Sequence, residues 1–458
     1  MEKNPQWPWI IYQIFPDRFC RSPKNQGNKK LASWSDLPTR SNFFGGDLAG
    51  IQEKLDYLQN LGVNAIYLNP VFKAHTNHRY DTEDYYEVDA LLGGNSALQH
   101  LIKSLHQRGM KIILDGVFNH CGDHFFAFQD LKKAGQESNY IDWFHVNHFP
   151  IETKPLSYMT CGGAEYLPKL NYANREVREY ILHAATYWLE EYGIDGWRLD
   201  VPFKVPFDFW EELNKVTKAA NPEVFLVGEI WKEPFAWVSG GVFDSATNYP
   251  LRNLLLEFVS SQFLDSEDFD YETSEFSKLL GDADSSMLNL LGSHDTTRIL
   301  TVLKGDAKKL KIALTYLFTN PGIPMIYYGD EIGLLGESDP DCRRPMPWQE
   351  EEWNQQVLSI YRNLIRLRQS YPLFWHGKKR KLFCFNGVYI YAIEHGVESA
   401  IVVLNPRETV HHVHVKTGIR CQRWVEFNSS AGMDGSDGML HFDQIPTDSA
   451  WVFLPEKP

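Results

Sequence analysis

Residues 112–120 read IILDGVFNH, an apolar run that is interrupted by Asp115 and closed by His120. Three later stretches have the same form: GWRLDV at 196–201, VFLVGEIW at 224–231 and LLGSHD at 290–295. Buried parallel strands read as continuous apolar runs, and in a (β/α)₈ barrel the carboxyl ends of the strands carry the chemistry. The four runs therefore predict a barrel whose strand ends gather one set of polar side chains: His120, Arg198, Asp200, Glu229, His294 and Asp295.

The surrounding sequence alternates strand-like and helix-like segments, as a parallel α/β barrel requires. A helix is expected to begin at Asp47 and to stop before Gly62, with apolar residues at helical spacing between them. Further helices are expected at 97–107, 175–192, 208–219 and 354–368. The expected strands are 9–16, 65–68, 111–118, 194–201, 223–228, 243–249, 286–292 and 324–328.

Two features set the domain organisation. The gap between the third and fourth expected strands is too long for one connecting helix, so residues 121–171 should form a small inserted domain at the mouth of the barrel. After residue 375 alternating strands follow one another without helices, which is typical of a β-sandwich. We therefore predict a (β/α)₈ barrel at 1–120 and 172–375, the insertion at 121–171, and a C-terminal antiparallel β-sandwich at 376–458.

Composition narrows the class of partner. The 458 residues carry a formal net charge of −14, which argues against nucleic acid and against an anionic membrane surface but is compatible with a neutral substrate. The amino terminus has no secretory pattern, and no apolar run is long enough to span a bilayer. The six cysteines are scattered without a C-x-x-C pair, which indicates free thiols and a cytoplasmic location.

The four stretches resemble, in order, the four signature regions of the α-amylase family of glycoside hydrolases (family 13). LPKLN at 167–171 is similar to the motif before the fourth strand in the cyclomaltodextrinase, neopullulanase and maltogenic amylase branch, and HRYDTEDY at 78–85 is similar to the pocket segment after the second strand. The resemblance runs from about Trp9 to the end of the chain. One such motif could arise by chance, whereas six in the family's order are highly specific.

The resemblance implies roles for individual residues. Asp200 matches the nucleophile, Glu229 the acid/base and Asp295 the third carboxylate, which holds sugar hydroxyls. Arg198, on the same strand face as Asp200, should lower the pKa of that carboxyl group. The residues expected to line the substrate site are His78, Tyr80, Asp115, His120, Arg198, Phe203, Lys204, Trp231, His294 and Arg298.

The sequence also departs from this branch. The barrel begins by about Trp9, without the branch's β-domain before the barrel, so monomer and homodimer both stay open. Asp200 is followed by Val-Pro-Phe-Lys at 201–204, where the branch has Val-Ala-Asn-Glu, which leaves specificity toward the acceptor sugar open. Gly45-Gly46-Asp47 matches half of a calcium loop, but the expected other half, 20–25, contains Arg21 and Lys24, which disfavour calcium. We expect no metal ligands and no required cofactor.

The leading hypothesis is a retaining α-glucan hydrolase that cleaves α-1,4-glucosidic bonds of maltooligosaccharides, cyclodextrins or pullulan, with transglycosylation as a second outcome. The alternative enzyme is a cytoplasmic α-amylase acting on longer starch or glycogen chains. A different class is a catalytically silent homologue that binds carbohydrate or serves a transporter. The presence of Asp200, Glu229 and Asp295 argues against the silent homologue, because such proteins usually lack at least one of these acids.

Overall fold

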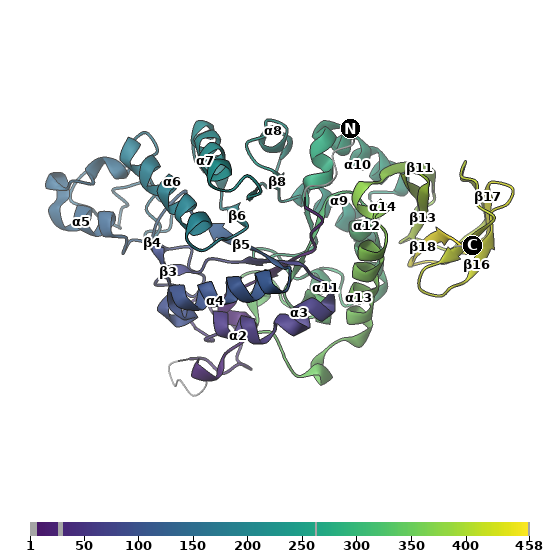
Figure 1. The fold of residues 1–458 in the computed structure, drawn as a ribbon, viewed down its shortest axis with the longest axis horizontal. Helices are drawn as coiled ribbons and strands as arrows, with labels where there is room; N and C mark the ends of the chain where they lie inside the picture. The colour runs from purple at the N-terminus through teal and green to yellow at the C-terminus, as the bar shows by residue number, and fades with distance from the viewer. Residues whose placement is uncertain (1–6, 26–30, 262, 457–458) are drawn as a thin grey trace.

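The computed structural model describes residues 7–25, 31–261 and 263–456. At its centre lies an eight-stranded parallel sheet in the order β8-β7-β6-β5-β2-β1-β10-β9 (Figure 1). Its strands are β1 (Ile11–Ile14), β2 (Ala65–Leu68), β5 (Lys111–Gly116), β6 (Gly196–Leu199), β7 (Phe225–Gly228), β8 (Ser245–Ala246), β9 (Leu288–Leu290) and β10 (Ile323–Tyr327). Each falls within or overlaps a strand expected from the sequence.

The two end strands of this sheet meet, so the sheet closes on itself. Thr247 forms a parallel bridge with Leu288, and the amide of Asn248 donates to the Leu288 carbonyl at 2.8 Å. The predicted (β/α)₈ barrel is therefore confirmed. Closure places all the strand carboxyl ends around one opening, which is the condition for the expected convergence of polar groups.

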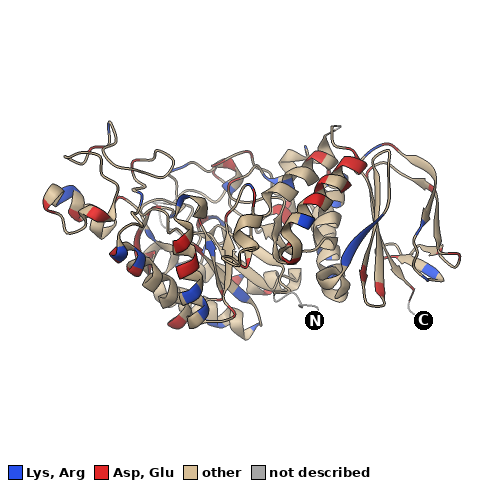
Figure 2. Ribbon diagram, turned by 90° about the horizontal axis from the view of Figure 1, so that it is seen from above, with Lys and Arg blue, Asp and Glu red and all other residues tan. Residues whose placement is uncertain are grey.

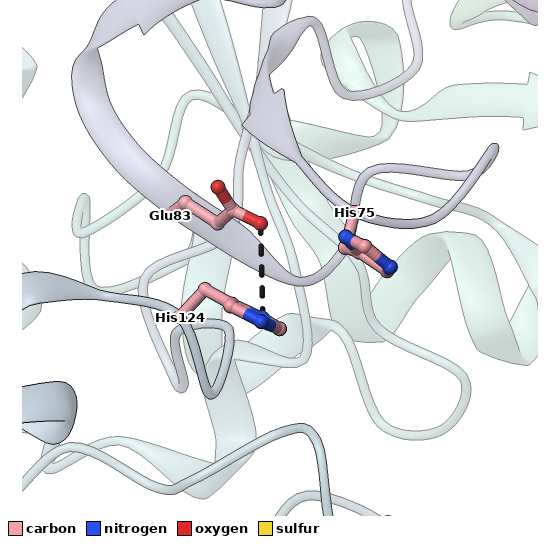
Figure 3. A group of neighbouring side chains, drawn as sticks. All are labelled: His75, Glu83 and His124. Carbon is pink, nitrogen blue, oxygen red and sulfur yellow. Dashed lines mark ion pairs between the residues drawn. The ribbon is translucent and has the colours of Figure 1, made fainter.

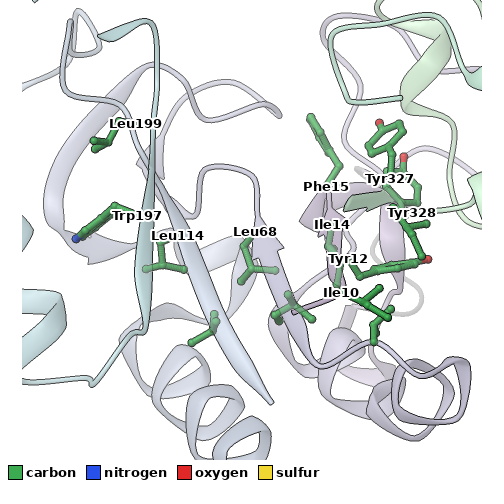
Figure 4. Close-up of a cluster of buried hydrophobic side chains, with 14 of the residues drawn as sticks. Ile10, Tyr12, Ile14, Phe15, Leu68, Leu114, Trp197, Leu199, Tyr327 and Tyr328 are labelled. Carbon is green, nitrogen blue, oxygen red and sulfur yellow. The ribbon is translucent and has the colours of Figure 1, made fainter. Parts of the chain in front are cut away.

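Side chains alternate between the inside and the outside of the barrel, as the pleat of a strand dictates. On β1, Ile11 packs inside against Phe225 and Met325, whereas Tyr12 and Ile14 pack outside. Figure 4 shows part of the outer cluster, to which β1, β2, β5, β6 and β10 all contribute. The covering helices are α2 (Leu48–Glu53), α3 (Leu55–Leu61), α4 (Gly94–Gln107), α6 (Arg175–Glu190), α7 (Phe207–Ala220), α8 (Phe235–Val238), α9 (Tyr249–Ser260), α10 (Ser266–Leu280), α11 (Ile299–Val302), α12 (Ala307–Thr319), α13 (Gln355–Ser370) and α14 (Leu373–His376).

The helix expected between Asp47 and Gly62 forms as two pieces. Asp47 caps α2 by accepting from the Gly50 amide at 2.6 Å, and Lys54, with φ −102° and ψ 8°, separates α2 from α3. Gly62 ends α3 with φ 95°, a backbone conformation that favours glycine. A Cβ there would also lie 2.6 Å from Ile365 Cγ2, so the close packing of α3 on α13 requires glycine as well.

The segment between β2 and α4 contains a hairpin that the sequence analysis did not predict. Its strands are β3 (Phe72–Ala74) and β4 (Thr82–Val88), which pair antiparallel. The polar sequence TEDYYEV of β4 has only three buried positions, so it lacks the apolar run on which the strand predictions relied. The hairpin joins the inserted segment, because the Gly122 amide donates to the Thr82 carbonyl at 2.8 Å.

The inserted segment and the terminal sheets lie at opposite ends of the long axis (Figure 1). Within 121–171 the structure has α5 (Phe126–Ala134) and short turns at Gly135–Glu137 and Ile141–Trp143. The C-terminal segment forms a six-stranded antiparallel sheet, β11-β12-β13-β18-β15-β16, and a two-stranded sheet, β14-β17. These strands are β11 (Lys378–Phe385), β12 (Val388–His395), β13 (Glu398–Asn405), β14 (Val410–Lys416), β15 (Arg423–Glu426), β16 (Gly432–Asp434), β17 (Met439–Ile445) and β18 (Ser449–Pro455).

The two terminal sheets enclose a separate apolar core that includes Ile390, Val403, Val415 and Phe442, which agrees with the predicted sandwich. The exact domain boundaries stay predictions. Acidic and basic residues are interspersed along the helices and strands (Figure 2). None of the helices in the described part of the chain combines the length and apolar character that crossing a bilayer would need.

Candidate active site

A single guanidinium joins three carboxylates at the carboxyl ends of β5, β6 and β7. Arg198 Nη1 lies 2.8 Å from Asp115 Oδ1 and 2.9 Å from Asp200 Oδ1, and Nη2 lies 3.1 Å from Glu229 Oε2. The register explains the convergence, because Asp115 pairs with Arg198 across β5 and β6, and Arg198 pairs with Val227 across β6 and β7. All four side chains are almost completely buried.

Glu229 is held by two further donors. The Val201 amide donates to Oε2 at 2.9 Å, and Trp231 Nε1 donates to Oε1 at 3.0 Å. Val201 has φ 36°, a strained value for a β-branched residue, and this turn directly after Asp200 aims the amide at Glu229. Trp231 is fixed in turn by stacking on Tyr249, with centroids 3.8 Å apart and planes 5° from parallel.

Asp200 carries an oxygen that the surrounding protein leaves open. Its Oδ1 accepts from Arg198, whereas Oδ2 accepts no hydrogen bond from any residue that the structure describes. Burial raises the pKa of Asp200 well above its usual range; Arg198 opposes this, and Glu229 and Asp115 add to it. Arg198 lowers the pKa of Asp200, as expected, but the net direction is upward, because burial, together with the neighbouring carboxylates, outweighs the guanidinium. Such a cluster suits a reaction in which one carboxylate attacks and another group delivers a proton.

Asp295 lies at the rim of the same site. Its Oδ1 accepts from Arg343 Nη2 at 3.2 Å, its Oδ2 lies 3.1 Å from His294 Nε2, and its side chain is 28% exposed. Arg343 also donates to the His294 carbonyl at 2.9 Å and pairs with Asp339 at 3.0 Å. Arg343 was not predicted from the sequence, because it follows a long loop after β10 and no strand end marks it.

His294 connects Asp295 to the interior of the barrel. Gln13 Nε2 donates to His294 Nδ1 at 2.8 Å, so the ring proton sits on Nε2, which faces the Tyr80 hydroxyl at 2.5 Å. Burial lowers the pKa of His294 well below its usual value, and Arg343 adds to the effect, so the ring is neutral. Tyr80 stacks on this ring at 7° between planes and reaches Asp115 Oδ2 at 3.0 Å.

Gln13 was also missed by the sequence analysis, and so was Tyr67, whose hydroxyl donates to Asp115 Oδ2 at 2.5 Å. A signal for Gln13 exists in the sequence. It is a polar residue in the middle of the apolar strand β1, at an alternate position that faces the barrel interior.

His78 and His120 lie beside Tyr80. His120 Nε2 donates to the Tyr80 carbonyl at 3.1 Å, its Nδ1 lies 3.1 Å from Asn119 Nδ2, and burial lowers its pKa to about 4. Both of its ring nitrogens are therefore engaged within the protein. His78 Nδ1 accepts from the Tyr80 amide at 3.1 Å, and burial lowers its pKa to about 3. A neutral His78 is left with its Nε2–H to donate.

The remaining expected residues divide into an exposed group and a buried one. Phe203 and Trp231 are 47% and 38% exposed, and Lys204 Nζ lies 5.8 Å from the Phe203 ring centroid, beyond the carboxyl ends of β6 and β7. Arg298 is 0% exposed and pairs with Asp330 at 2.9 Å. It offers no surface to a ligand, so its expected contact with substrate is revised to a structural role at the turn after β10.

The loop that resembles half of a calcium site is satisfied by the protein itself. Asp47 Oδ1 accepts from the Gly50 amide at 2.6 Å, and Oδ2 accepts from Ser22 Oγ at 2.5 Å and from Asn25 Nδ2 at 2.8 Å. Asn25 Nδ2 also donates to the Gly45 carbonyl at 3.2 Å. The Asn25 side-chain nitrogen therefore contacts oxygen atoms that would otherwise be available as calcium ligands.

Comparison with known proteins shows the family of this chain. The family described as "Alpha amylase, catalytic domain" matches residues 13–385. A cyclomaltodextrinase from Thermoanaerobacter pseudethanolicus is 43% identical over 406 residues, which is 88% of this chain and 71% of that protein. The ligand-free cyclic α-maltosyl-(1→6)-maltose hydrolase from Arthrobacter globiformis superposes with a TM-score of 0.89 at 35% identity, over 99% of this chain and 100% of that one. The debranching enzyme from Nostoc punctiforme gives a TM-score of 0.89 at 36% identity, over 100% of both chains.

Proposed function

This chain belongs to the α-amylase family of glycoside hydrolases, and we propose that it is a retaining enzyme that cleaves α-1,4-glucosidic bonds in maltooligosaccharides, cyclodextrins or pullulan. The main support for the proposal is that the Arg198 guanidinium contacts both Asp200 and Glu229. Retaining hydrolysis needs two carboxyl groups about 5 Å apart, one as nucleophile and one as acid and then base. The contacts of Arg198 Nη1 with Asp200 and of Nη2 with Glu229 support this pairing, because adjacent nitrogens of one guanidinium bring the two carboxyl groups to the same place.

In the proposed reaction, Asp200 Oδ2 attacks the anomeric carbon while Glu229 protonates the departing glycosidic oxygen. The bond to the leaving sugar breaks and a glucosyl ester of Asp200 forms. Glu229 then removes a proton from water, which attacks the anomeric carbon and releases Asp200. A sugar hydroxyl in place of water gives transglycosylation. Asp295 and His78 are proposed to hold hydroxyl groups of the sugar that reacts.

Exposed aromatic side chains at the edge of the candidate active site favour the proposal of a short or cyclic substrate. Phe203 and Trp231 offer exposed aromatic faces beside the acids, and an aromatic face covers the apolar face of a pyranose ring. The cyclomaltodextrinase and the cyclic α-maltosyl-(1→6)-maltose hydrolase carry cyclic sugars in their names, which supports the same class of substrate here. An α-amylase acting on long starch or glycogen chains is the alternative, and a silent homologue is disfavoured by the three acids.

The discriminating experiment compares initial rates on β-cyclodextrin, pullulan and soluble starch, with Glu229→Gln as the inactive control. The proposal predicts higher kcat/KM on β-cyclodextrin than on starch, and panose from pullulan. Rapid loss of starch viscosity with little cleavage of β-cyclodextrin would instead support the α-amylase. Equal activity of wild type and Glu229→Gln on all three substrates would contradict the proposed role of Glu229 as the acid and base.

We propose that hydrolysis requires no calcium, since Asp47 Oδ2 already accepts hydrogen bonds from Ser22 and Asn25. We also propose an intracellular location, which the six free cysteines support, because thiols persist in reducing compartments. The assembly is proposed to be a monomer or a homodimer, which light scattering resolves.

A further inference from the structure

Two histidines and a glutamate converge at the junction between the β3–β4 hairpin and the inserted segment (Figure 3). His75 directly follows β3, Glu83 is the second residue of β4, and His124 lies just before α5. One nitrogen or oxygen atom from each side chain lies within 4.8 Å of the corresponding atom of the others. No metal ligands were expected from the sequence, because the positions of His75, Glu83 and His124 form no known spacing motif.

The geometry of the group resembles an open metal site. His124 Nδ1 lies 3.9 Å from Glu83 Oε1, and the rings of His75 and His124 are stacked, with centroids 5.1 Å apart and planes 16° from parallel. Ligand atoms around a zinc ion are about 3.3–3.6 Å apart, given bonds of about 2.0–2.2 Å in tetrahedral geometry. Small rotations of the side chains would bring the three atoms to that spacing.

The charge around the group also favours a cation. No Lys or Arg nitrogen of the described residues lies within 4.0 Å of the Glu83 carboxylate, and the side chain paired with it is the imidazole of His124. Asp123 Oδ1 adds negative charge 3.0 Å from His124 Nδ1, although Lys132 pairs with the other Asp123 oxygen at 3.2 Å. The His124 side chain is 49% exposed, so an ion can enter from solvent.

We propose that His75, Glu83 and His124 bind one divalent transition-metal ion, with water completing the coordination. Two imidazoles and one carboxylate are the ligand set that suits zinc and its neighbours, whereas calcium requires oxygen ligands throughout. The three ligands come from two separate segments, so the ion would fasten the inserted segment to the hairpin.

The hairpin lies next to the candidate active site. His78 and Tyr80 lie on the loop that joins β3 to β4, and the same loop is held by the Asp81 carboxylate, which accepts from the His75 amide at 3.0 Å. An ion on His75 would therefore restrain the loop that carries the pocket residues, without touching Asp200 or Glu229. The expected consequence is greater resistance to unfolding rather than a change in the chemical step.

The test is binding of Zn²⁺ and Co²⁺ to protein that has been stripped with a chelator. We expect one equivalent of Zn²⁺ by calorimetry and a Co²⁺ absorption spectrum typical of nitrogen and oxygen ligands. His75→Ala and His124→Ala should each weaken the binding more than about tenfold, because even loss of a supporting partner costs about 10- to 100-fold. Zn²⁺ should raise the unfolding temperature of the wild type and not of these two variants.

The chain offers a matched control. His414 and His441 form a second, exposed pair on the terminal sheets, with Nδ1 atoms 2.8 Å apart and Asp437 within 3.1 Å of His441. His414→Ala should leave the stoichiometric site intact, and all variants keep the six thiols. Wild-type protein that binds no more Zn²⁺ than His124→Ala, or that loses its site in His414→Ala, would overturn the proposal. Unchanged hydrolysis by His124→Ala would show that the variant is folded, and it would leave the proposed function untouched.

Discussion

Asp200 Oδ1 and Asp115 Oδ1 lie 2.9 Å and 2.8 Å from the same atom, Nη1 of Arg198. The proposed nucleophile is thus coupled through one nitrogen to a carboxylate that is itself too deeply buried to meet substrate. Asp115 acts as a positioning residue, since it holds Arg198 and accepts from Tyr67 and Tyr80. The charge of Asp115 nevertheless affects the proposed reaction, because Asp115 is one of the groups that raise the pKa of Asp200.

Asp115→Asn should therefore move the pH profile of the enzyme. The free enzyme needs Asp200 ionised, and burial raises the pKa of Asp200, so kcat/KM should rise with pH along a limb above the usual carboxylate range near pH 4. Removal of the Asp115 charge lowers the pKa of Asp200, which shifts this acidic limb to lower pH while kcat falls. The measurement is kcat/KM against pH on a small maltooligosaccharide. A shift to higher pH would contradict the account, and Asp56→Asn, at an exposed ion pair on α3, should shift nothing.

Trp231 has two separable roles, which two substitutions can distinguish. Trp231→Phe keeps a ring to stack on Tyr249 but loses the Nε1 donor to Glu229, so kcat should fall about 10- to 100-fold with little change in KM. Trp231→Ala also loses the exposed aromatic face, so KM should rise as well. Steady-state kinetics on β-cyclodextrin measures both effects. Equal KM values for the two variants would show that the aromatic face does not contact sugar.

A substitution at Gly122 tests how closely the inserted segment packs on the β3–β4 hairpin. A Cβ at this position would lie 2.4 Å from the Asp81 carbonyl oxygen, which is backbone and cannot rotate away. Gly122→Ala should therefore destabilise the protein by about 1–3 kcal/mol. Gly240→Ala is the control, since a Cβ there meets nothing closer than 3.6 Å. Urea unfolding of the two variants should show a lower midpoint for the first alone.

Asp195 supplies a pH-dependent part of the stability at the amino end of β6. Burial raises the pKa of Asp195, but hydrogen bonds from His106 at 2.8 Å, Lys111 at 2.7 Å and the Ile112 amide at 3.0 Å outweigh it, so the net pKa is lowered. A carboxylate with a lowered pKa stabilises the folded state above its unfolded pKa and loses that effect as the pH falls through the folded pKa.

Asp195→Asn should consequently lower stability by about 1–3 kcal/mol at neutral pH. The difference from the wild type should shrink below about pH 4, where the wild-type carboxyl group begins to take up its proton. Thermal unfolding of both proteins between pH 3 and pH 8 measures the effect. A difference that stays constant over this range would show that the charge of Asp195 contributes nothing.

The parts of the site that the sequence predicted share one physical feature. Asp115, Arg198, Glu229 and Asp295 each stand at or just after the end of an apolar run, and a closed parallel barrel brings such ends together whatever the loops do. Arg343 and Gln13 could not be found in this way. Arg343 reaches Asp295 from a loop whose path the local sequence does not determine, and Gln13 is a polar residue within a strand.

Arg298 and the β3–β4 hairpin show where prediction from the sequence failed. Arg298 follows Asp295 by three residues, but the turn between them leaves Asp295 partly exposed and directs Arg298 into the core beside Asp330. Asp295 and Arg298 are therefore close in sequence, but only Asp295 can reach a substrate. The polar β4 strand gave no strand signal because its neighbours, and not its own apolar content, hold it in place.

Asp200 is proposed to attack the sugar, and covalent trapping of the glycosyl ester can identify the attacking residue. A 5-fluoro-α-glucosyl fluoride forms its glycosyl ester faster than the ester is hydrolysed, so the label accumulates on the nucleophile for peptide mapping by mass spectrometry. We expect one 5-fluoroglucosyl group on the peptide that contains Asp200, none in Asp200→Asn, and α-configured sugar as the first product by NMR. Label on Glu229 or Asp295, or a β-configured first product, would contradict it.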